Sequence, residues 1–510
     1  MKKQSLIKGS LILGIAGIIT RFLGLFFRWP LIMLIGDEGV GYYQMSYPLY
    51  MFFVAVASGV PVAISKLISE NNVLADEEGN FTVIKEASKL MAILGIGSST
   101  ILFLFSRQII SFLEWDNKSY YSLLGISIAP AIISFLTVFR GFFQGYQNMT
   151  PSAISQILEQ IGRVVVGVGL AILFLPRGIE YSAGGAALGA AAGGLCALIY
   201  LFLKYKHTKE VLGIKRVKSD NKILDKIIKI AIPISLGASV GTIMNLIDSI
   251  IVPKKLLEAG FSSREATILY SQLTGKASVI VNIPLTLSMA ICTSLIPIIA
   301  EVYMLKRKRE LQEKIDLTIK LSMFVSIPSF LGLFYLAGPI LNMIFPGKAE
   351  GGMILRYLAI SIPFIVLTQT TTSVMQGVGE YMKPIFSLII GCIIKVIITS
   401  MLVSIEKINI YGAIIGTIFS YMCVSIINIL LVKVKLNIKI NLYNNFIKIM
   451  YAGTVMIFCV VFSFNYIYRY TLSNNLSCLL SIGTGAIIYF VAIILFKVFK
   501  IEDIKKKIKN

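Results

Sequence analysis

The chain of 510 residues is 56% apolar and only 15% charged, with a mean hydropathy of +0.81. This composition excludes an array of soluble domains and indicates a protein that crosses a membrane many times. A net charge of +22 would suit nucleic acid or an anionic membrane surface. Because the basic runs lie between apolar stretches, with no nucleic-acid-binding module around them, we expect lipid headgroups and no nucleic acid as partners.

Fourteen apolar stretches are long enough to cross a bilayer, which needs about 20 helical residues. The first is too long for a signal-peptide core of roughly 7 to 15 residues, so we expect it to stay in the mature protein. The sequence therefore predicts an all-α polytopic membrane protein of about 14 transmembrane helices. The stretches cover approximately residues 6–35, 42–69, 88–112, 120–143, 152–175, 182–204, 226–252, 267–302, 317–345, 353–376, 382–404, 410–432, 446–468 and 477–499.

The connections between these stretches alternate in charge. Connections such as Gly36 to Gly41 are short and often acidic, and those between them are rich in Lys and Arg. The positive-inside rule then predicts a multi-pass plasma-membrane protein with both termini cytoplasmic. The basic set comprises the N-terminal Lys2, Lys3 and Lys8, the connections 204–229, 306–320 and 433–448, and the tail 497–509.

Short motifs recur at a nearly constant spacing along the chain, which indicates an internal repeat. Six helices per half bring the chain back to the same side, so the halves should be parallel repeats of the kind that rock about a central cavity in alternating-access transporters. The matched positions are Gln144-Gly145 with Gln376-Gly377, Pro151 with Pro384, Gly185 with Gly412, and Glu70 with Glu301.

The repeat divides the chain into four parts. Helices 13 and 14 fall outside the two halves and should have a separate role. Within the sixth helix Gly185, Gly189 and Gly193 are spaced by four, which lets another helix approach closely. The parts are an N-terminal six-helix lobe at 1–204, a basic cytoplasmic linker at 205–225, a C-terminal six-helix lobe at 226–434, and helices 13–14 with the tail at 435–510.

The first apolar stretch carries Arg21 and Arg28. Seven residues apart on a helix, the two side chains lie about 20° from each other around the axis, so they share one face. A guanidinium facing lipid at the bilayer centre costs about 3 kcal/mol, so we expect this face to look into a polar interior that suits an anion. The alternative is that Arg28 only extends to the interface and that Arg21 pairs with a buried carboxylate.

Other charges inside the predicted helices are mainly cationic. Glu159 and Arg163 are four apart and should form an ion pair, and Lys395 is the repeat equivalent of Arg163. Lys276 could reach the cavity or anchor at a headgroup, and Asp248 could couple a cation or proton or neutralise an arginine. We predict a substrate-binding cationic cavity of Arg21, Arg28, Arg163, Lys276 and Lys395, with Asp248 and Glu159 as coupling or pairing residues.

Enzyme and metal chemistry find little support in the sequence. The sole histidine, His207, lies in the basic linker, and no Walker, HExxH or GxSxG motif occurs. The cysteines lie in or beside apolar runs without metal-like spacing, so they should be packing residues. We expect no catalytic residue, metal or cofactor. The six cysteines are Cys196, Cys292, Cys392, Cys423, Cys459 and Cys478.

Two segments, Gly39 to Glu70 and Arg140 to Val164, resemble the stage V sporulation protein B and polysaccharide-transporter branch of the multidrug/oligosaccharidyl-lipid/polysaccharide exporter superfamily. The resemblance implies two six-helix lobes and the flipping of undecaprenyl-pyrophosphate-linked saccharides, with helices 13 and 14 lining a groove for the lipid tail. Arg21-Phe-Leu-Gly24 resembles the start of the R-x-L-G-x-x-R pattern in the first helix of related lipid II flippases, whereas Arg28 of this chain follows one residue later than in that pattern. The resemblance implies a cavity role for both arginines. Lys276 lies roughly where such flippases carry a cation.

These observations predict a flippase that moves a polyprenyl-pyrophosphate-linked saccharide, a cell-wall, spore-cortex or polysaccharide precursor, by alternating access. Arg and Lys suit phosphate oxygens, and an ion gradient or the membrane potential would drive the step. A cation-coupled multidrug exporter of the same fold is the alternative, although organic cations would favour carboxylates. A membrane-embedded saccharide ligase is a further alternative, which covalent change of the saccharide would reveal.

Overall fold

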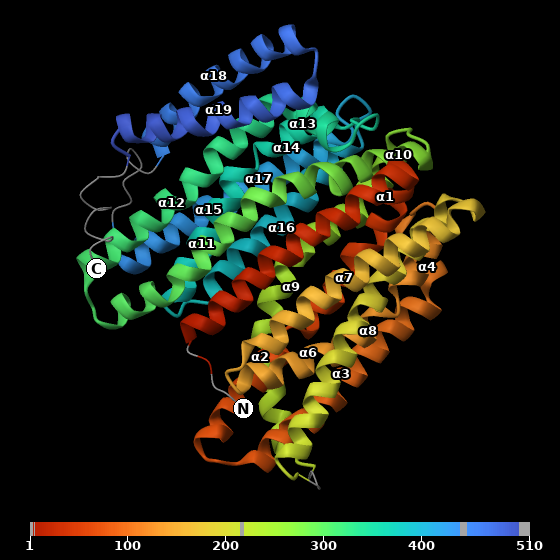
Figure 1. Cartoon of the computed structure of the whole chain (residues 1–510), viewed down its shortest axis with the longest axis vertical. Coiled ribbons are helices and arrows are strands. Elements are labelled where there is room, and N and C mark those ends of the chain that lie inside the picture. Colours follow the sequence, from red (N-terminus) through yellow and green to blue (C-terminus); the bar gives the residue numbers. More distant parts are fainter. Residues whose placement is uncertain (1–3, 5, 215–218, 439–445, 499–510) are drawn as a thin grey trace. The chain divides into compact units, whose positions relative to one another are not determined.

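The computed structural model describes residues 4, 6–214, 219–438 and 446–498, and all the regular structure among them is helical (Figure 1). The predicted basic ends, including Lys2, Lys3 and residues 499–510, lie outside the described residues. The chain forms two compact units, unit 1 over Met1–Ser271 and unit 2 over Gln272–Asn510.

Unit 1 contains two long helices, several shorter helices that pack beside them, and one 3₁₀ turn. Long apolar runs without internal caps produce the long helices, and Asp76 caps α3 by accepting a hydrogen bond from the Gly79 amide at 2.8 Å. The elements are α1 (Leu6–Ala57), α2 (Gly59–Val73), α3 (Glu77–Leu104), α4 (Ser106–Leu113), α5 (Ser119–Ile126), α6 (Ala129–Gly145), α7 (Met149–Phe174), η1 (Leu175–Arg177), α8 (Ile179–Val211), α9 (Asn221–Glu258) and α10 (Ser263–Ser271).

Unit 2 begins with a π-helical turn and continues through nine α-helices in its described part. They are η2 (Gln272–Ala277), α11 (Ser278–Met304), α12 (Lys308–Tyr335), α13 (Ala337–Ile344), α14 (Gly352–Ala359), α15 (Ile362–Gly377), α16 (Met382–Val403), α17 (Tyr411–Leu436), α18 (Lys448–Thr471) and α19 (Asn474–Leu495).

The membrane-length helices agree with the predicted polytopic all-α fold. Among the described residues, 12 stretches are long and apolar enough to cross a membrane, and the pair α14 and α15, bent by 42°, can form one more. The stretch Ile12–Val73 has 62 residues, far more than one crossing needs. It bends at Gly36, whose φ of 66° favours glycine. Counting this stretch as two crossings gives fourteen.

The helix boundaries confirm the internal repeat. The series α3, α4, α5 and α6 has 28, 8, 8 and 17 residues, and α12, α13, α14 and α15 have 28, 8, 8 and 16. Each member of the second series begins at a nearly constant offset from its counterpart, as Glu77 and Lys308 illustrate. The same breaks therefore occur in both halves, including the short helix that follows each long one.

Helix α9 starts the second half of the repeat but packs within unit 1. The Gly59 amide donates to Ser235 Oγ at 3.0 Å, and a Cβ at Gly59 would lie 2.1 Å from the Ala231 carbonyl oxygen. The Trp115 indole also donates to the Ser249 carbonyl at 2.7 Å. These contacts explain why the compact units divide after Ser271. The lobe boundary at the basic linker 205–225, drawn from the repeat, stays a prediction.

Helices α7 and α8 pack closely along the glycines that the spacing indicated. A Cβ on Gly193 would lie 2.1 Å from the Glu159 carbonyl oxygen, and one on Gly189 would lie 2.8 Å from that of Arg163. Glycine is needed there because the backbones touch. The α7 residues that carry the intramembrane charges are thereby fixed against α8.

The turn between α6 and α7 is held by buried polar groups. The Tyr146 hydroxyl accepts a hydrogen bond from Asn80 Nδ2 at 3.0 Å and donates to the Glu77 carboxylate. Burial, together with the hydrogen bond to Glu77, raises the pKa of Tyr146, so the hydroxyl keeps its proton. A Cβ at Gly145 would lie 2.6 Å from Ile68. The repeated Gln144-Gly145 position therefore lies in a turn with a structural role.

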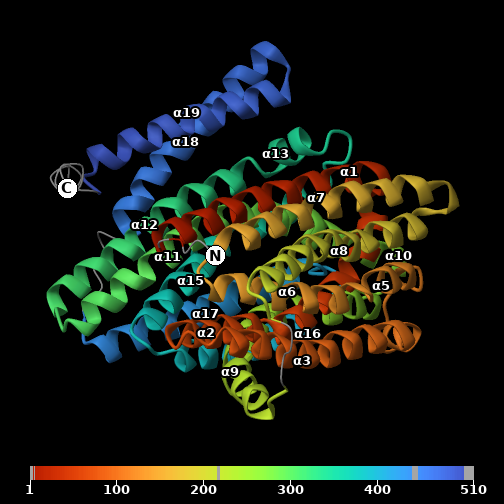
Figure 2. The same ribbon diagram turned by 60° about the horizontal axis from the view of Figure 1, so that its bottom comes forward.

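Helices α18 and α19 run side by side in both views (Figure 1 and Figure 2). They join the rest of unit 2 through the Tyr489 hydroxyl, which donates to the Phe324 carbonyl at 2.9 Å, and through Asn474 Nδ2, which donates to the Pro339 carbonyl at 3.0 Å. Their outer faces expose large side chains such as Phe458 and Phe462. An exposed apolar face of this extent suits contact with lipid.

Candidate functional site

Arg21 and Arg28 share a face of α1 with three glycines. Gly14, Gly17 and Gly24 follow the same spacing of three and four residues, and a Cβ at any of them would have no neighbouring atom within 4 Å. Arg21 is exposed and Arg28 is half-buried. Arg21 forms no hydrogen bond or ion pair with another residue in the described part of the chain. We call these five residues the Gly/Arg face.

The first part of α1 has three distinct faces, about 120° apart at 100° per residue. One is buried in unit 1, with Ala16, Phe27 and Leu31 at most 3% exposed. The second exposes bulky apolar side chains and suits lipid; its members are Ile15, Ile18, Ile19, Phe22, Phe26 and Trp29. The Gly/Arg face is the third. It is open but carries no apolar side chain, which is what a water-filled interior requires.

A buried charge network lies further along unit 1. Arg163, only 8% exposed, pairs with Glu159 at 3.6 Å, as the sequence predicted. Arg140 Nη2 donates to the other oxygen of Glu159 at 2.9 Å, and Arg140 Nε donates to Ser155 Oγ at 2.9 Å. Two guanidinium groups thus share one carboxylate, so the network keeps one net positive charge.

The sequence reasoning missed Arg140 as a partner of Glu159. The signal was present, because α6 and α7 are joined by a three-residue turn and run antiparallel. Arg140 lies five residues before the end of α6, and Ser155 lies six residues after the start of α7, so the two face each other. The same antiparallel geometry brings the long arginine side chain to Glu159.

Lys395 occupies the equivalent place in the second half. It lies on α16 and is 2% exposed. A Cβ at Gly416 would lie 3.5 Å from the Lys395 carbonyl oxygen, which parallels the approach of Gly189 to Arg163. Both halves therefore set a buried cation on a helix that packs against a glycine of the next helix.

Lys276 lies inside unit 2 with no exposed surface. Its ammonium donates to the carbonyls of Lys348 at 2.7 Å and Glu350 at 3.4 Å, and it lies 3.5 Å from the Glu350 carboxylate and 5.9 Å from the Phe345 ring centre. These contacts brace the loop between α13 and α14. They favour a structural role, and a role of Lys276 in substrate binding stays a proposal.

Asp248 is 8% exposed on α9 within unit 1. The next residue, Ser249, is also buried, and its carbonyl accepts the hydrogen bond from the Trp115 indole. A buried carboxylate on a membrane helix is a reasonable site for a coupling cation or proton. Glu159 fits that role less well because two guanidinium groups already engage it.

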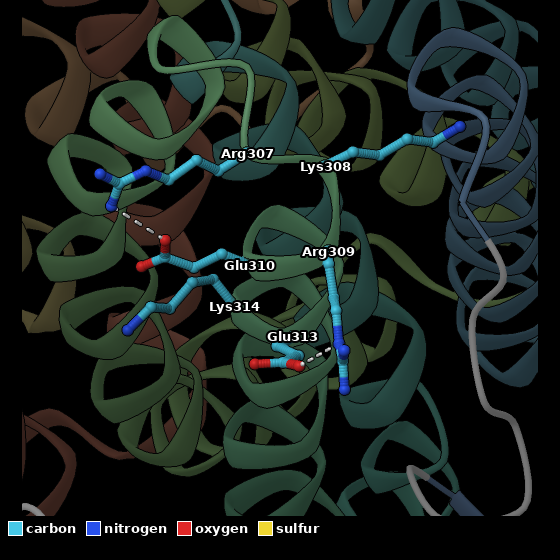
Figure 3. A pocket seen from close by; sticks show the side chains of 6 residues that line it. All are labelled: Arg307, Lys308, Arg309, Glu310, Glu313 and Lys314. Carbon is cyan, nitrogen blue, oxygen red and sulfur yellow. Dashed lines mark hydrogen bonds and ion pairs between the residues drawn. The ribbon is translucent and has the colours of Figure 1, made fainter.

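A hollow of about 570 Å³ lies on the surface at the start of α12 (Figure 3). Four cations and two carboxylates line it, joined by Arg307 to Glu310 at 3.4 Å and Arg309 to Glu313 at 3.5 Å. Exposed pairs of this kind contribute about 0.5 kcal/mol each. The hollow belongs to the basic connection predicted to be cytoplasmic, and we assign the candidate site to the intramembrane charges instead.

A family model described as "Polysaccharide biosynthesis protein" matches residues 6–303, more than half of the chain. The chain belongs to this polysaccharide biosynthesis protein family. A second model, MatE, matches residues 274–401, in the half that repeats the first. This membership confirms the family that the sequence motifs indicated.

Relatives of this polysaccharide biosynthesis family member cover most of its length. The chain is 26% identical to stage V sporulation protein B of Bacillus subtilis (strain 168), over 99% of this chain and 98% of that one. It is also 26% identical to the lipid II flippase MurJ of the same organism, over 84% and 83%. These relatives support a multi-pass membrane transporter and not an enzyme.

A solved structure of lipid II flippase MurJ, in an inward closed conformation, matches with a TM-score of 0.75. It is 17% identical and covers 96% of this chain and 99% of that one. At this identity the likeness shows the fold, which is the polytopic helical fold that the hydropathy predicted.

Proposed function

We propose that the protein is a flippase that moves a polyprenyl-pyrophosphate-linked saccharide across the plasma membrane by alternating access. The observation that carries this proposal is the Gly/Arg face of α1. On this face, Arg21 and Arg28 lie among glycines that border open space, whereas a different face of the same helix carries the bulky apolar side chains that suit lipid. Arginine forks bind the oxygens of a pyrophosphate well.

The names of the relatives support the same substrate class. One is a lipid II flippase and another a sporulation protein, so the precursor would serve the cell wall, the spore cortex or another polysaccharide. The pyrophosphate would enter the cationic interior while the polyprenyl tail stays in lipid beside α18 and α19. Both termini would be cytoplasmic by the charge of the connections, and Asp248 is our candidate for coupling to a cation or proton.

The second candidate is a cation-coupled multidrug exporter, which the MatE match at 274–401 favours. The intramembrane charges argue against it. Among the candidate site residues and their partner Arg140, the cations Arg21, Arg28, Arg140, Arg163 and Lys395 outnumber the carboxylates Glu159 and Asp248, and an organic cation would be repelled by such an excess.

Transbilayer movement of a fluorescent polyprenyl-pyrophosphate saccharide in proteoliposomes tests the proposal. We expect movement with the wild type and at least tenfold slower movement with Arg21→Ala, which removes about 1.4 kcal/mol or more of binding. Arg309→Ala, at an arginine whose side chain is 96% exposed, is the matched control and should move the lipid normally. Absence of movement in the wild type under several ion gradients would refute the flippase.

A further inference from the structure

A row of aromatic rings follows the Gly36 bend on one face of α1. Tyr43, Tyr47 and Tyr50 are spaced by four and three residues, and their neighbouring ring centres lie 5.5 and 5.8 Å apart. Phe27 continues the row, 5.7 Å from Tyr43 in an edge-to-face contact. Tyr43 and Tyr50 are buried, whereas Tyr47 is half-buried. The Tyr47 ring is therefore the part of the row that a ligand can reach.

This row lies beside the charge network of unit 1. The phenol groups of Tyr43, Tyr47 and Tyr50 are all within electrostatic range of the Arg163 guanidinium, and Tyr43 is also within range of Arg28. The row also packs directly on α7, because a Cβ at Gly167, about one helical turn beyond Arg163, would lie 2.8 Å from the Phe27 ring. The row therefore lies against the part of α7 that carries Arg163.

Two buried polar atoms of α7 have no hydrogen-bond partner among the described residues. They are Nε of Arg163 and Oε1 of Gln160. The residues are three apart, so they lie on one face of the helix. One atom is a donor and the other an acceptor. Leaving either unsatisfied costs about 1 to 3 kcal/mol, so the pair calls for a group that both accepts and donates.

We propose that Arg163, Gln160 and Tyr47 form a subsite for a sugar ring, separate from the arginines that face the pyrophosphate. A sugar hydroxyl accepts from Arg163 Nε and donates to Gln160 Oε1, while an apolar C–H face of the ring lies on Tyr47. An ionised pyrophosphate only accepts, so it leaves Gln160 Oε1 unsatisfied. This proposal rests on the lipid-linked saccharide of the proposed function.

Ligand-induced thermal stabilisation of the purified full chain tests the subsite without depending on transport. The two probes are undecaprenyl pyrophosphate carrying N-acetylglucosamine and undecaprenyl pyrophosphate without sugar. Gln160→Leu and Tyr47→Leu should each weaken apparent binding of the sugar-bearing lipid about tenfold and change binding of the sugar-free lipid by less than about twofold. Both residues are half-buried and outside the ion pairs, so these variants should fold.

Two further variants serve as controls. Tyr47→Phe keeps the ring and should keep most of the affinity for the sugar-bearing lipid. Gln108→Leu makes the same chemical change at an exposed position of α4 and should bind both lipids like the wild type.

Three results would overturn the subsite. An equal loss of binding for both lipids would assign the residues to the pyrophosphate or to folding. Unchanged binding of both lipids would mean that water alone satisfies the two atoms. A wild type that binds neither lipid would exclude a lipid-linked sugar as the ligand. A wild type that binds both lipids with the expected difference, yet moves neither in proteoliposomes, would refute the flippase but support the subsite.

Discussion

Glu38 and Arg264 are joined by a hydrogen-bonded ion pair of 2.8 Å, although 226 residues separate them. Glu38 also accepts a hydrogen bond from the Tyr42 hydroxyl at 2.8 Å and lies 3.9 Å from Lys118 Nζ. By the internal repeat, α1 belongs to the first half and α10 to the second. The Glu38 carboxylate therefore connects elements of both halves within unit 1, at the end that contains the Gly36 bend.

Replacing Glu38 by Gln should destabilise this end of unit 1. The Glu38 side chain is 13% exposed and accepts two hydrogen bonds, whereas the side chain of Arg264 is 73% exposed. We therefore expect Glu38→Gln to lower the free energy of unfolding by about 1 to 2 kcal/mol. Arg264→Ala should cost less, and Lys118→Ala, with its 3.9 Å contact, least. Thermal melting of the purified variants in detergent measures this order, and equal melting of all three would contradict it.

A crosslink between positions 38 and 264 should stop transport. In an alternating-access protein, the halves must separate at this end for the substrate to leave. We expect Glu38→Cys with Arg264→Cys, in a background without the native cysteines, to lose movement of the lipid probe when a short thiol crosslinker is added. The control pair Asp225→Cys and Lys229→Cys crosslinks within α9, where the native residues form an i,i+4 ion pair. Transport that survives efficient crosslinking of residues 38 and 264 would refute the gating role.

The fold was largely predictable from sequence because membrane crossings depend on local composition and the repeat leaves matching motifs. The Gly/Arg face was also readable, since Gly14, Gly17, Arg21, Gly24 and Arg28 follow helical spacing. The ion pairs were only partly predictable from sequence, because they depend on how helices far apart in the chain pack together.

Two residues illustrate this limit. The partner of Glu159 at the shortest distance, Arg140, lies on another helix. Lys276 is bound by loop carbonyls far along the chain, which no local pattern indicates. Spacing identifies pairs within one helix, whereas contacts between helices need the three-dimensional structure.

The buried network of Arg140, Glu159 and Arg163 predicts how strongly each substitution lowers the free energy of unfolding. Glu159→Gln leaves Arg140 and Arg163 without their shared carboxylate, so it should cost about 3 to 5 kcal/mol of folding free energy. Arg140→Gln leaves a neutral Glu159 and Arg163 pair and should cost less. The double variant should be less destabilised than the sum of the two, by at least about 1 kcal/mol. Additive losses in a double-mutant cycle of thermal unfolding would exclude this coupling.

Glycines that border open space and glycines at a helix contact should respond differently to substitution. Gly24→Leu places a side chain in open space, so it should leave stability nearly unchanged while it fills the Gly/Arg face and slows lipid movement at least tenfold. Gly169→Leu, also in open space but away from that face, is its control. Gly193→Ala should instead lower the free energy of unfolding by about 1 to 3 kcal/mol, because its Cβ meets the Glu159 carbonyl. Normal transport by Gly24→Leu would show that the face does not contact the substrate.

Substitution of Lys276 distinguishes a structural role of this residue from a role in substrate binding. If its ammonium braces the loop after α13, Lys276→Met should lower the free energy of unfolding by about 2 kcal/mol, because buried carbonyls lose a charged donor. Lys348→Met is the matched control, since the backbone carbonyl of residue 348 remains. Glu350→Gln should have a small effect because the Glu350 side chain is 63% exposed. A Lys276→Met variant that melts like the wild type but fails to move the lipid would instead assign Lys276 to the substrate, because its loss would then affect transport without affecting the fold.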